Sequence, residues 1–139
     1  MRTILVDAGP LIALFAADDR HHARYRDLIL ESDLRGLRFV TTWPCIVEAS
    51  YLLATVQRLE MLAFVEAGGI QVFPFDVGHL GVMRGWMRRY SEPGKREMDL
   101  ADASLYWLAT QVGVTEIMTV DRGDFERYRL PGGQAFHII

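Results

Sequence analysis

Short apolar runs rich in β-branched residues alternate along this chain with longer stretches in which apolar residues recur at helical spacing. The short runs predict strands at residues 3–6, 38–42, 70–75, 116–120 and 134–139. The longer stretches predict helices at 10–17, 20–32, 44–55, 59–67, 78–90 and 98–111, and a helical turn at 124–128. Alternating strands and helices are typical of a mainly parallel sheet covered on both faces, so we expect an α/β fold.

Length and composition fit one folded domain that covers residues 1–139. A chain of 139 residues can bury about two-thirds of the surface that it exposes when unfolded. Its 50% hydrophobic and 24% charged residues argue against disorder and against a coiled coil. The formal net charge of −3 is too small to draw the whole molecule onto nucleic acid or membrane, so any phosphate contact has to be local.

Cysteine content and hydropathy bear on the compartment. Cys45 is the only cysteine, which excludes an intrachain disulfide and a zinc site built from several cysteines. The apolar stretch 8–17 has the position of a signal peptide, but Pro10 lies inside it and Asp7 interrupts the run that precedes it. No window approaches the roughly 18 apolar residues of a membrane span. We therefore expect a cytoplasmic protein without a membrane partner.

Acidic residues occur where a parallel sheet forms its ligand sites. Asp7 follows the first predicted strand and Asp121 follows the fourth, so both lie at carboxyl ends of strands. Glu48 lies in the first turns of a helix, and Asp99 and Asp102 lie three residues apart near the start of another. Taken singly, each acid has a structural explanation as a turn, cap or first-turn residue. Taken together, acids from four elements at one end of a sheet favour a functional site.

Mutual repulsion limits what such a cluster can be. Two unit charges 4 Å apart oppose each other by about 4 kcal/mol at an effective dielectric constant of about 20. Either some pKa values rise or a hard divalent cation neutralises the cluster, and oxygen ligands select Mg²⁺ or Mn²⁺ over zinc. The four histidines are scattered and argue against zinc: His21, His22, His79 and His137.

Carboxylate-bound Mg²⁺ suits phosphodiester hydrolysis, because it can activate water and stabilise the attacking and leaving oxygens. Thr119 and Asp124 flank Asp121 and are candidates to orient a ligand or a water. The chain contains no Walker A loop and no dinucleotide-binding glycine pattern. Cys45 is better explained as a buried helix residue than as a nucleophile.

Four segments resemble the PIN-domain nucleases, and most closely the toxin subunits of bacterial and archaeal VapBC toxin–antitoxin pairs. These segments are 4–14, 42–53, 99–105 and 117–125. The resemblance implies a three-layer α/β/α PIN-like fold and metal-dependent cleavage of RNA. It also implies an acidic quartet of catalytic and metal-binding residues, formed by Asp7, Glu48, Asp102 and Asp121. Asp99 is the alternative to Asp102 as the acid that faces the metal, and Asp124 matches a more variable acid.

The resemblance further implies a homodimer and a small antitoxin whose tail lies in a groove beside the site. A pairing surface is compatible with the apolar residues of 51–65, which exceed one narrow helical stripe; two helices that share one core explain them equally well. These residues are Tyr51, Leu52, Leu53, Val56, Leu59, Met61, Leu62, Phe64 and Val65. Candidate contacts to the RNA backbone, which are equally compatible with a solvated face, are Arg88, Arg89, Lys95, Arg96 and Arg122.

Two other functions compete with a ribonuclease toxin. A phosphoacceptor receiver domain also places acids around Mg²⁺ at strand ends, but it needs a lysine at the end of a late strand, and Lys95 falls in the breaker-rich loop 91–96. A catalytically silent interaction module could retain the PIN-like fold. The intact acid set argues against such a module, and activity decides the question.

Overall fold

The computed structural model describes residues 1–139 and contains one five-stranded sheet in the order β3-β2-β1-β4-β5. All neighbouring strands are parallel, with Leu5 of the central strand opposite Val40 on one side and Ile117 on the other. The expected α/β fold is confirmed, and the mainly parallel sheet is entirely parallel. The strands are β1 (Arg2–Val6), β2 (Leu37–Thr42), β3 (Gln71–Phe73), β4 (Glu116–Met118) and β5 (His137–Ile138).

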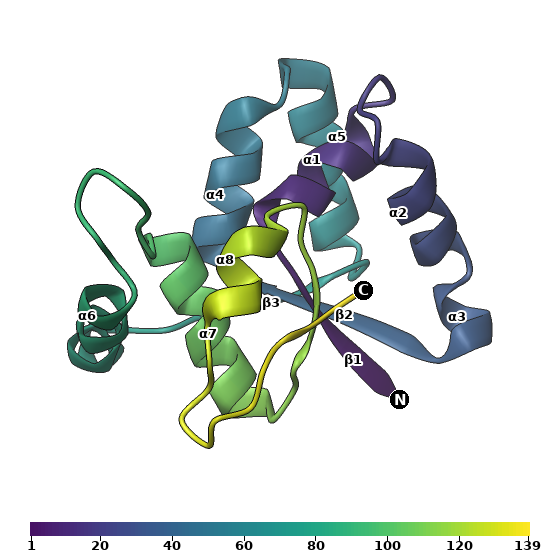
Figure 1. Cartoon of the computed structure of the whole chain (residues 1–139). Helices are drawn as coiled ribbons and strands as arrows, with labels where there is room; N and C mark the ends of the chain where they lie inside the picture. The colour runs from purple at the N-terminus through teal and green to yellow at the C-terminus, as the bar shows by residue number, and fades with distance from the viewer.

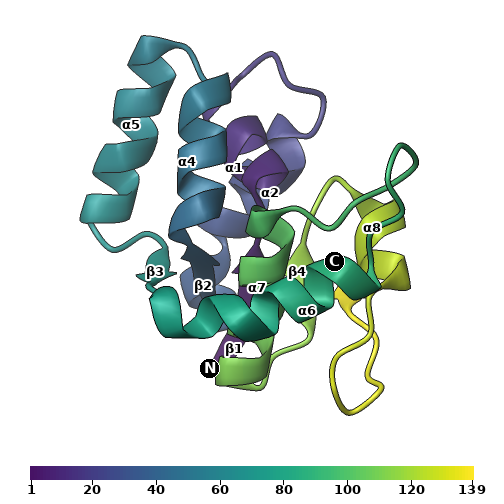
Figure 2. The same cartoon turned by 90° about the vertical axis from the view of Figure 1, so that its left-hand side faces the viewer.

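Helices cover both faces of this sheet (Figure 1). A quarter turn of the molecule shows α5 beside α4, and α6 lying across the outer side of α7 (Figure 2). The helices are α1 (Ala8–Phe15), α2 (His22–Leu30), α3 (Ser32–Arg35), α4 (Trp43–Leu52), α5 (Thr55–Glu66), α6 (Leu80–Arg89), α7 (Leu100–Val112) and α8 (Arg122–Arg127), with a 3₁₀ turn η1 (Val77–His79) before α6.

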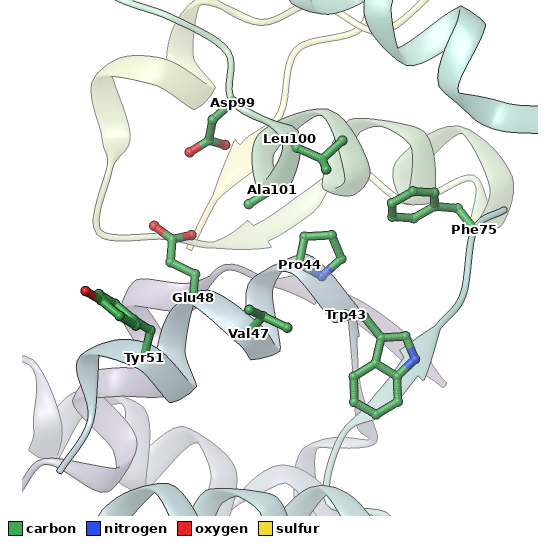
Figure 3. Close-up of a pocket in the computed structure, with 9 residues that line it drawn as sticks. All are labelled: Trp43, Pro44, Val47, Glu48, Tyr51, Phe75, Asp99, Leu100 and Ala101. Carbon is green, nitrogen blue, oxygen red and sulfur yellow. The ribbon is translucent and has the colours of Figure 1, made fainter. Parts of the chain in front are cut away.

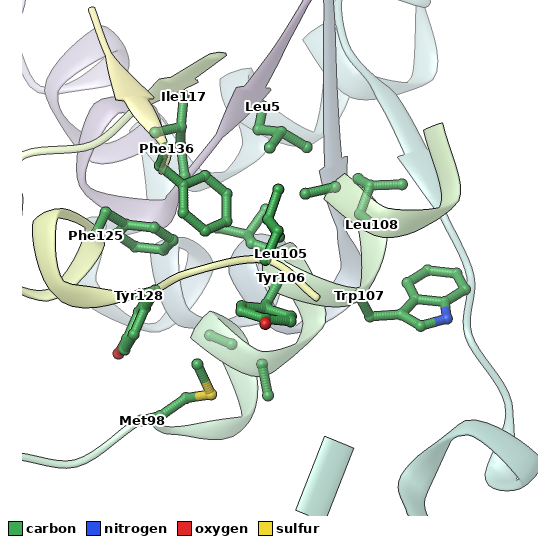
Figure 4. Packing of buried hydrophobic residues seen from close by; sticks show 14 of the residues in the cluster. Leu5, Met98, Leu105, Tyr106, Trp107, Leu108, Ile117, Phe125, Tyr128 and Phe136 are labelled. Carbon is green, nitrogen blue, oxygen red and sulfur yellow. The ribbon is translucent and has the colours of Figure 1, made fainter. Parts of the chain in front are cut away.

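Alternate strand residues enter two separate hydrophobic cores. Ile4 and Val6 of β1 pack into the core that contains residues of α1, α2, α4 and α5. Leu5, between them, packs into the core formed with α6, α7 and α8 (Figure 4). Because strand side chains alternate between faces, this division confirms the three-layer α/β/α arrangement.

Helix α7 is the most deeply buried helix and fills the second core. Every residue from Ala103 to Ala109 is buried, as is Ala101. Asp99 caps its amino end, and Gly113, in the left-handed conformation with φ of 68°, ends it. The helix therefore begins at Leu100 rather than at residue 98, and Asp102 enters the core side of the molecule from its first turn.

Several element boundaries differ from those predicted. The helix expected at 20–32 is interrupted by a turn at Glu31, which separates α2 from α3. The strand expected at 116–120 ends at Met118, because the chain turns there and the hydroxyl of Thr119 accepts a hydrogen bond from the backbone of Asp121. The strand expected at 134–139 pairs only over His137–Ile138, at the edge of the sheet.

Further boundaries shift on the helices. Helix α5 begins at Thr55 rather than at 59, and α4 ends at Leu52. Strand β3 covers only Gln71–Phe73, and α8 begins at Arg122, two residues earlier than expected.

None of the helices combines the length and the apolarity that crossing a membrane requires.

The apolar residues proposed from sequence as a pairing surface divide into two groups. Leu53 and Met61 are buried in the first core, and Phe64 and Val65 pack against it. The others are exposed on α4 and α5: Tyr51, Leu52, Val56, Leu59 and Leu62. A shared core therefore accounts for some of these residues, and five remain as an exposed apolar surface, called here the α4–α5 surface.

Candidate functional site

Asp7 is the most buried acid at the carboxyl end of the sheet. It follows β1, caps α1 and is 8% exposed. Its Oδ1 accepts a hydrogen bond from the backbone of Ala8 at 2.7 Å, and its Oδ2 accepts one from the Thr119 hydroxyl at 2.8 Å. The Thr119 oxygen in turn accepts from the backbone N–H of Asp121 at 3.0 Å. One threonine therefore links the Asp7 carboxylate to the backbone of the turn that carries Asp121.

Burial raises the pKa of Asp7 above its ordinary value, and the bonds from Thr119 and Ala8 oppose that rise because they favour the charged carboxylate. The negative charges of Asp99 and Asp124 raise it further. A nearby positive charge would therefore stabilise the ionised carboxylate of Asp7.

Asp99 and Asp102 are linked at the start of α7. Oδ1 of Asp99 accepts a hydrogen bond from the backbone N–H of Asp102 at 2.8 Å. Oδ2 of Asp102 accepts one from the Tyr128 hydroxyl at 2.7 Å. Burial raises the pKa of Asp102 to about 8, with the hydrogen bond from Tyr128 opposing the rise and the charge of Asp7 adding to it.

Glu48 and Asp99 share a groove beside the other acids. Figure 3 shows their carboxylates reaching toward the same space from α4 and from the start of α7. Burial raises the pKa of Glu48, and the charges of Asp99, Asp7 and Asp121 raise it further. The groove has a volume of about 700 Å³ and is lined by Trp43, Pro44, Val47, Glu48, Tyr51, Phe75, Asp99, Leu100 and Ala101.

Asp121 and Asp124 lie at the start of α8. Burial and the neighbouring Asp124 raise the pKa of Asp121 to about 6. Asp124 differs from the other acids because it has a cationic partner, the guanidinium of Arg127 at 3.2 Å. That guanidinium also donates to the backbone carbonyl of Tyr90 at 2.7 Å, which ties α8 to the end of α6.

The structure places the predicted acids at one end of the sheet: Thr119 links Asp7 to the Asp121 backbone, Asp99 bonds to the backbone of Asp102, and Glu48 lines one groove with Asp99. Charge effects connect Asp7, Glu48, Asp99, Asp102, Asp121 and Asp124, which we call the acidic cluster. Asp99 raises the pKa of three other members, so Asp99 and Asp102 both belong to the cluster. The structure contains no group of three or more His, Cys, Asp or Glu side chains already arranged to hold a metal ion. Hydrogen bonds to Ala8, Thr119, Tyr128 and the Asp102 backbone instead occupy carboxylate oxygens of Asp7, Asp99 and Asp102.

The basic residues predicted to contact RNA are all exposed and none forms an ion pair with the acidic cluster. Lys95 and Arg96 lie 3.8 Å and 3.9 Å from the Glu92 carboxylate. Arg122 pairs with Glu126 at 3.5 Å, although it follows Asp121 directly in the chain. Arg88 and Arg89 form the last turn of α6, where Arg89 lies over the ring of Tyr90.

Tyr128 and Arg127 contact the acidic cluster and were not predicted from sequence. The spacing of three residues between Asp124 and Arg127 on one helix is a recognisable signal for an ion pair. Tyr128 gives no such signal, because 26 residues separate it from Asp102. Only the packing of α8 against α7 brings its hydroxyl to the carboxylate.

Fold and site together define an α/β/α protein with an acidic site at the carboxyl ends of parallel strands. A family model described as the PIN domain matches residues 4–130, so the chain belongs to the PIN domain family. The resemblance noted from the sequence is thereby confirmed.

One similar solved structure is that of VapC20 from Mycobacterium tuberculosis, described as a toxin that cleaves the sarcin-ricin loop. The two chains share 19% sequence identity with a TM-score of 0.69, over 82% of this chain and 86% of the other. This likeness shows a shared fold. A comparison with curated proteins gives no match.

Proposed function

We propose that this protein is a metal-dependent endoribonuclease that acts as the toxin of a toxin–antitoxin pair in the cytoplasm. The observation that carries the proposal is the convergence of acids from β1, α4, α7 and the β4–α8 turn at one end of a PIN-domain sheet. Burial and neighbouring acids raise the pKa values of these carboxyl groups, a pattern that is typical of functional sites. The toxin activity of VapC20, whose fold this chain shares, supports RNA as the substrate.

The donor set suits a hard divalent cation, Mg²⁺ or Mn²⁺, because it offers only carboxylate oxygens. We assign Asp7, Glu48, Asp102 and Asp121 to hold it, with Asp99 as the alternative to Asp102. Such a cation, when bound, neutralises the phosphodiester and activates the attacking water. Asp124 has a supporting role, since its carboxylate is already paired with Arg127.

The chain's own residues prepare this site before substrate arrives. Thr119 donates to the Asp7 carboxylate and accepts from the backbone N–H of Asp121, so it links Asp7 to the turn that carries Asp121. The proposed contacts to the RNA backbone are Arg88, Arg89, Lys95, Arg96 and Arg122, which are all exposed; the ion pairs of the last three, to Glu92 and Glu126, lie 3.5 to 3.9 Å apart at the surface. If water attacks the phosphorus and the 3′-oxygen leaves, as the resemblance to PIN-domain nucleases implies, the products carry a 5′-phosphate and a 3′-hydroxyl.

We also propose a small antitoxin as the partner that covers the groove of Figure 3. Its walls expose Trp43, Val47 and Tyr51, while Glu48 and Asp99 add two carboxylates and no basic residue lines it. A segment with apolar side chains and one basic side chain is complementary to such a surface. Val47→Asp should abolish co-purification with the product of the adjacent reading frame, and unchanged co-purification contradicts this assignment.

A homodimer is proposed through the part of the α4–α5 surface outside that groove, where Val56 is 68% exposed and Leu59 is 61% exposed. Exposed apolar patches of this kind mark association surfaces. Leu59→Glu is expected to convert a dimer into a monomer in sedimentation analysis. A monomeric wild-type protein contradicts the dimer without affecting the nuclease proposal.

Cleavage of RNA in Mg²⁺ or Mn²⁺, compared with EDTA, tests the central proposal. Asp121→Asn should abolish the metal-dependent cleavage, because it removes a cluster carboxylate while keeping the side-chain shape. Glu116→Gln is the matched control, since this acid lies at the opposite end of the sheet and pairs with Arg2. Full cleavage by the Asp121 variant refutes the assignment, and no cleavage by the wild type favours the silent interaction module.

A receiver domain is the weaker alternative. It requires a lysine at the end of a late strand, whereas Lys95 lies in the exposed loop before α7 and faces Glu92. Transfer of phosphate from a small phosphodonor to an aspartate would be its signature.

A further inference from the structure

Tyr128 is the only tyrosine whose hydroxyl contacts the acidic cluster. The hydroxyl donates to Oδ2 of Asp102 at 2.7 Å. Two other tyrosines in the same aromatic group, Tyr90 and Tyr106, donate instead to the backbone carbonyl of Arg129. Those two hydroxyls hold a loop in place, whereas that of Tyr128 acts on a side chain of the proposed site.

The ring of Tyr128 cannot swing away from Asp102. Its side chain is fully buried and belongs to the core formed with α6, α7 and α8. The ring of Phe125 packs edge-on at 5.2 Å between centroids, and that of Tyr90 packs similarly at 5.1 Å. The position of the hydroxyl is therefore set by the core, where Figure 4 shows Tyr128 beside Phe125. The hydrogen bond in turn sets the position of the Asp102 carboxylate oxygen that accepts it.

This contact matters because it fixes one carboxylate of the acidic cluster. The Tyr128 hydroxyl holds one of the two oxygens of Asp102, and the buried ring sets the direction of that hydrogen bond. With Oδ2 held by Tyr128, the carboxylate keeps one orientation, and Oδ1 has no hydrogen-bond partner in the structure.

We propose that Tyr128 is a positioning residue that orients the Asp102 carboxylate and thereby sets the affinity of the site for a divalent cation. This inference rests on the proposed function. Partners that orient a ligand of a metal typically change metal affinity or activity by about 10- to 100-fold when they are removed. The role predicts a defect in metal binding and not in RNA binding.

Tyr128→Phe tests this role, because it removes one oxygen and keeps the ring. Tyr90→Phe is the matched control, as it removes a hydroxyl from the same aromatic group without touching an acid. Two readouts are compared in titrations with Mn²⁺ and Mg²⁺: the rise in melting temperature and the rate of RNA cleavage. The cleavage rates are measured well below the lowest melting midpoint found in EDTA, so that both variants are folded in that assay.

The Tyr128 variant should need about 10-fold or more metal for half of either effect, with the KM for RNA unchanged at saturating metal. The Tyr90 variant should match the wild type. In an Asp102→Asn background, Tyr128→Phe should have no further effect on metal affinity, as expected if the tyrosine acts through that acid.

The outcomes separate this inference from the proposed function. If the wild type cleaves RNA and Tyr128→Phe has the metal dependence of the wild type, the role of Tyr128 is overturned and the nuclease stands. If the wild type binds metal without cleaving RNA and the Tyr128 variant binds it more weakly, the nuclease proposal falls and the role of Tyr128 stands. Equal loss of metal affinity in the Tyr90 variant would assign the effect to packing and overturn the inference.

Discussion

At the amino ends of β1 and β4, Arg2 and Glu116 form an ion pair that lowers the pKa of Glu116. At the carboxyl ends of the same two strands, Asp7 and Asp121 have raised pKa values and lie among other acids. The same two strands thus place carboxyl groups in opposite electrostatic settings. The ion pair at the amino end stabilises the fold. The carboxylates at the other end repel one another until a cation binds to them or protons neutralise them.

Parallel topology explains the difference between the two ends. All carboxyl ends of the strands meet at one edge, so residues that follow different strands become neighbours there. Burial of Asp7 and Asp102 then amplifies each repulsion, because opposing charges are weakly screened away from water. The variants below change one end or the other, in order of decreasing expected effect.

Asp102→Asn should have the largest effect, because it removes a proposed metal ligand. RNA cleavage is expected to fall by at least about 100-fold, since even indirect contacts to a metal ligand change activity by 10- to 100-fold. The same variant should melt at a higher temperature than the wild type in EDTA near pH 8, because a repelling charge is gone. A lower melting temperature there would show that the carboxylate stabilises the fold, contrary to the comparison.

The pH dependence of stability should have the sign of raised carboxyl pKa values. Asp102 and Asp121 titrate at about 8 and about 6 in the folded protein, against values near 4 for unfolded aspartate (about 3.9). The folded protein therefore binds more protons than the unfolded chain between these values. Asp102 is largely buried, so its titration should lower the free energy of unfolding in EDTA by a few kcal/mol, as an order of magnitude, between about pH 4 and pH 8. Asp121 is exposed and adds less, because solvent screens its charge.

Urea denaturation at a series of pH values measures this slope. Asp102→Asn should flatten the part of the curve between about pH 6 and pH 8, because the pKa of Asp102 lies at the upper end of that range. A divalent cation should flatten it too, because it favours the ionised carboxylates. If the free energy of unfolding in EDTA instead rises with pH, the folded protein stabilises these acids as anions, contrary to this prediction.

Gly9→Ala tests how closely the chain packs at the acidic end. A methyl group at Gly9 would lie 2.3 Å from Cγ2 of Val120, the residue between Thr119 and Asp121. Overpacking of this kind costs about 1–3 kcal/mol, and here it also moves the turn that carries Asp121. Thermal melting and the cleavage assay should both show the defect, and Val120→Ala in the same chain should restore much of each. Failure of that rescue would place the strain elsewhere.

Glu116→Gln should have the smallest effect, since its partner Arg2 is solvent-exposed and exposed pairs contribute little. The folded pKa of Glu116 is lowered, so its contribution is present above the ordinary glutamate pKa and is lost as the pH falls through the lowered value. The variant should therefore be slightly less stable at neutral pH, opposite in sign to Asp102→Asn. Melting in low and high salt checks this, because salt should reduce the difference.

Much of the fold could be predicted from local pattern. The run at 3–6 is apolar and β-branched, and its alternation places Leu5 on one face and Ile4 on the other. Boundaries were less predictable where a side chain decided them. A hydrogen bond to the Thr119 hydroxyl ends β4 at Met118. Another, to the Asp99 carboxylate, makes α7 begin at Leu100 rather than at residue 98.

The acids at strand ends could also be predicted, because parallel strands carry such residues to one edge whatever their sequence separation. The orientation of each carboxylate could not. The contact between Tyr128 and Asp102, and the pairing of Asp124 with Arg127 and the carbonyl of Tyr90, depend on how α8 packs against α6 and α7.

The sequence by itself determined the alternation of strands and helices, the parallel sheet and the set of acids at its carboxyl end. Local spacing and burial patterns are sufficient for these, since each depends on neighbouring residues. Tertiary structure alone decided which acids share a groove, which have protein partners, and which apolar residues of α4 and α5 remain exposed. These depend on distances between segments far apart in the chain, which only the packed core sets.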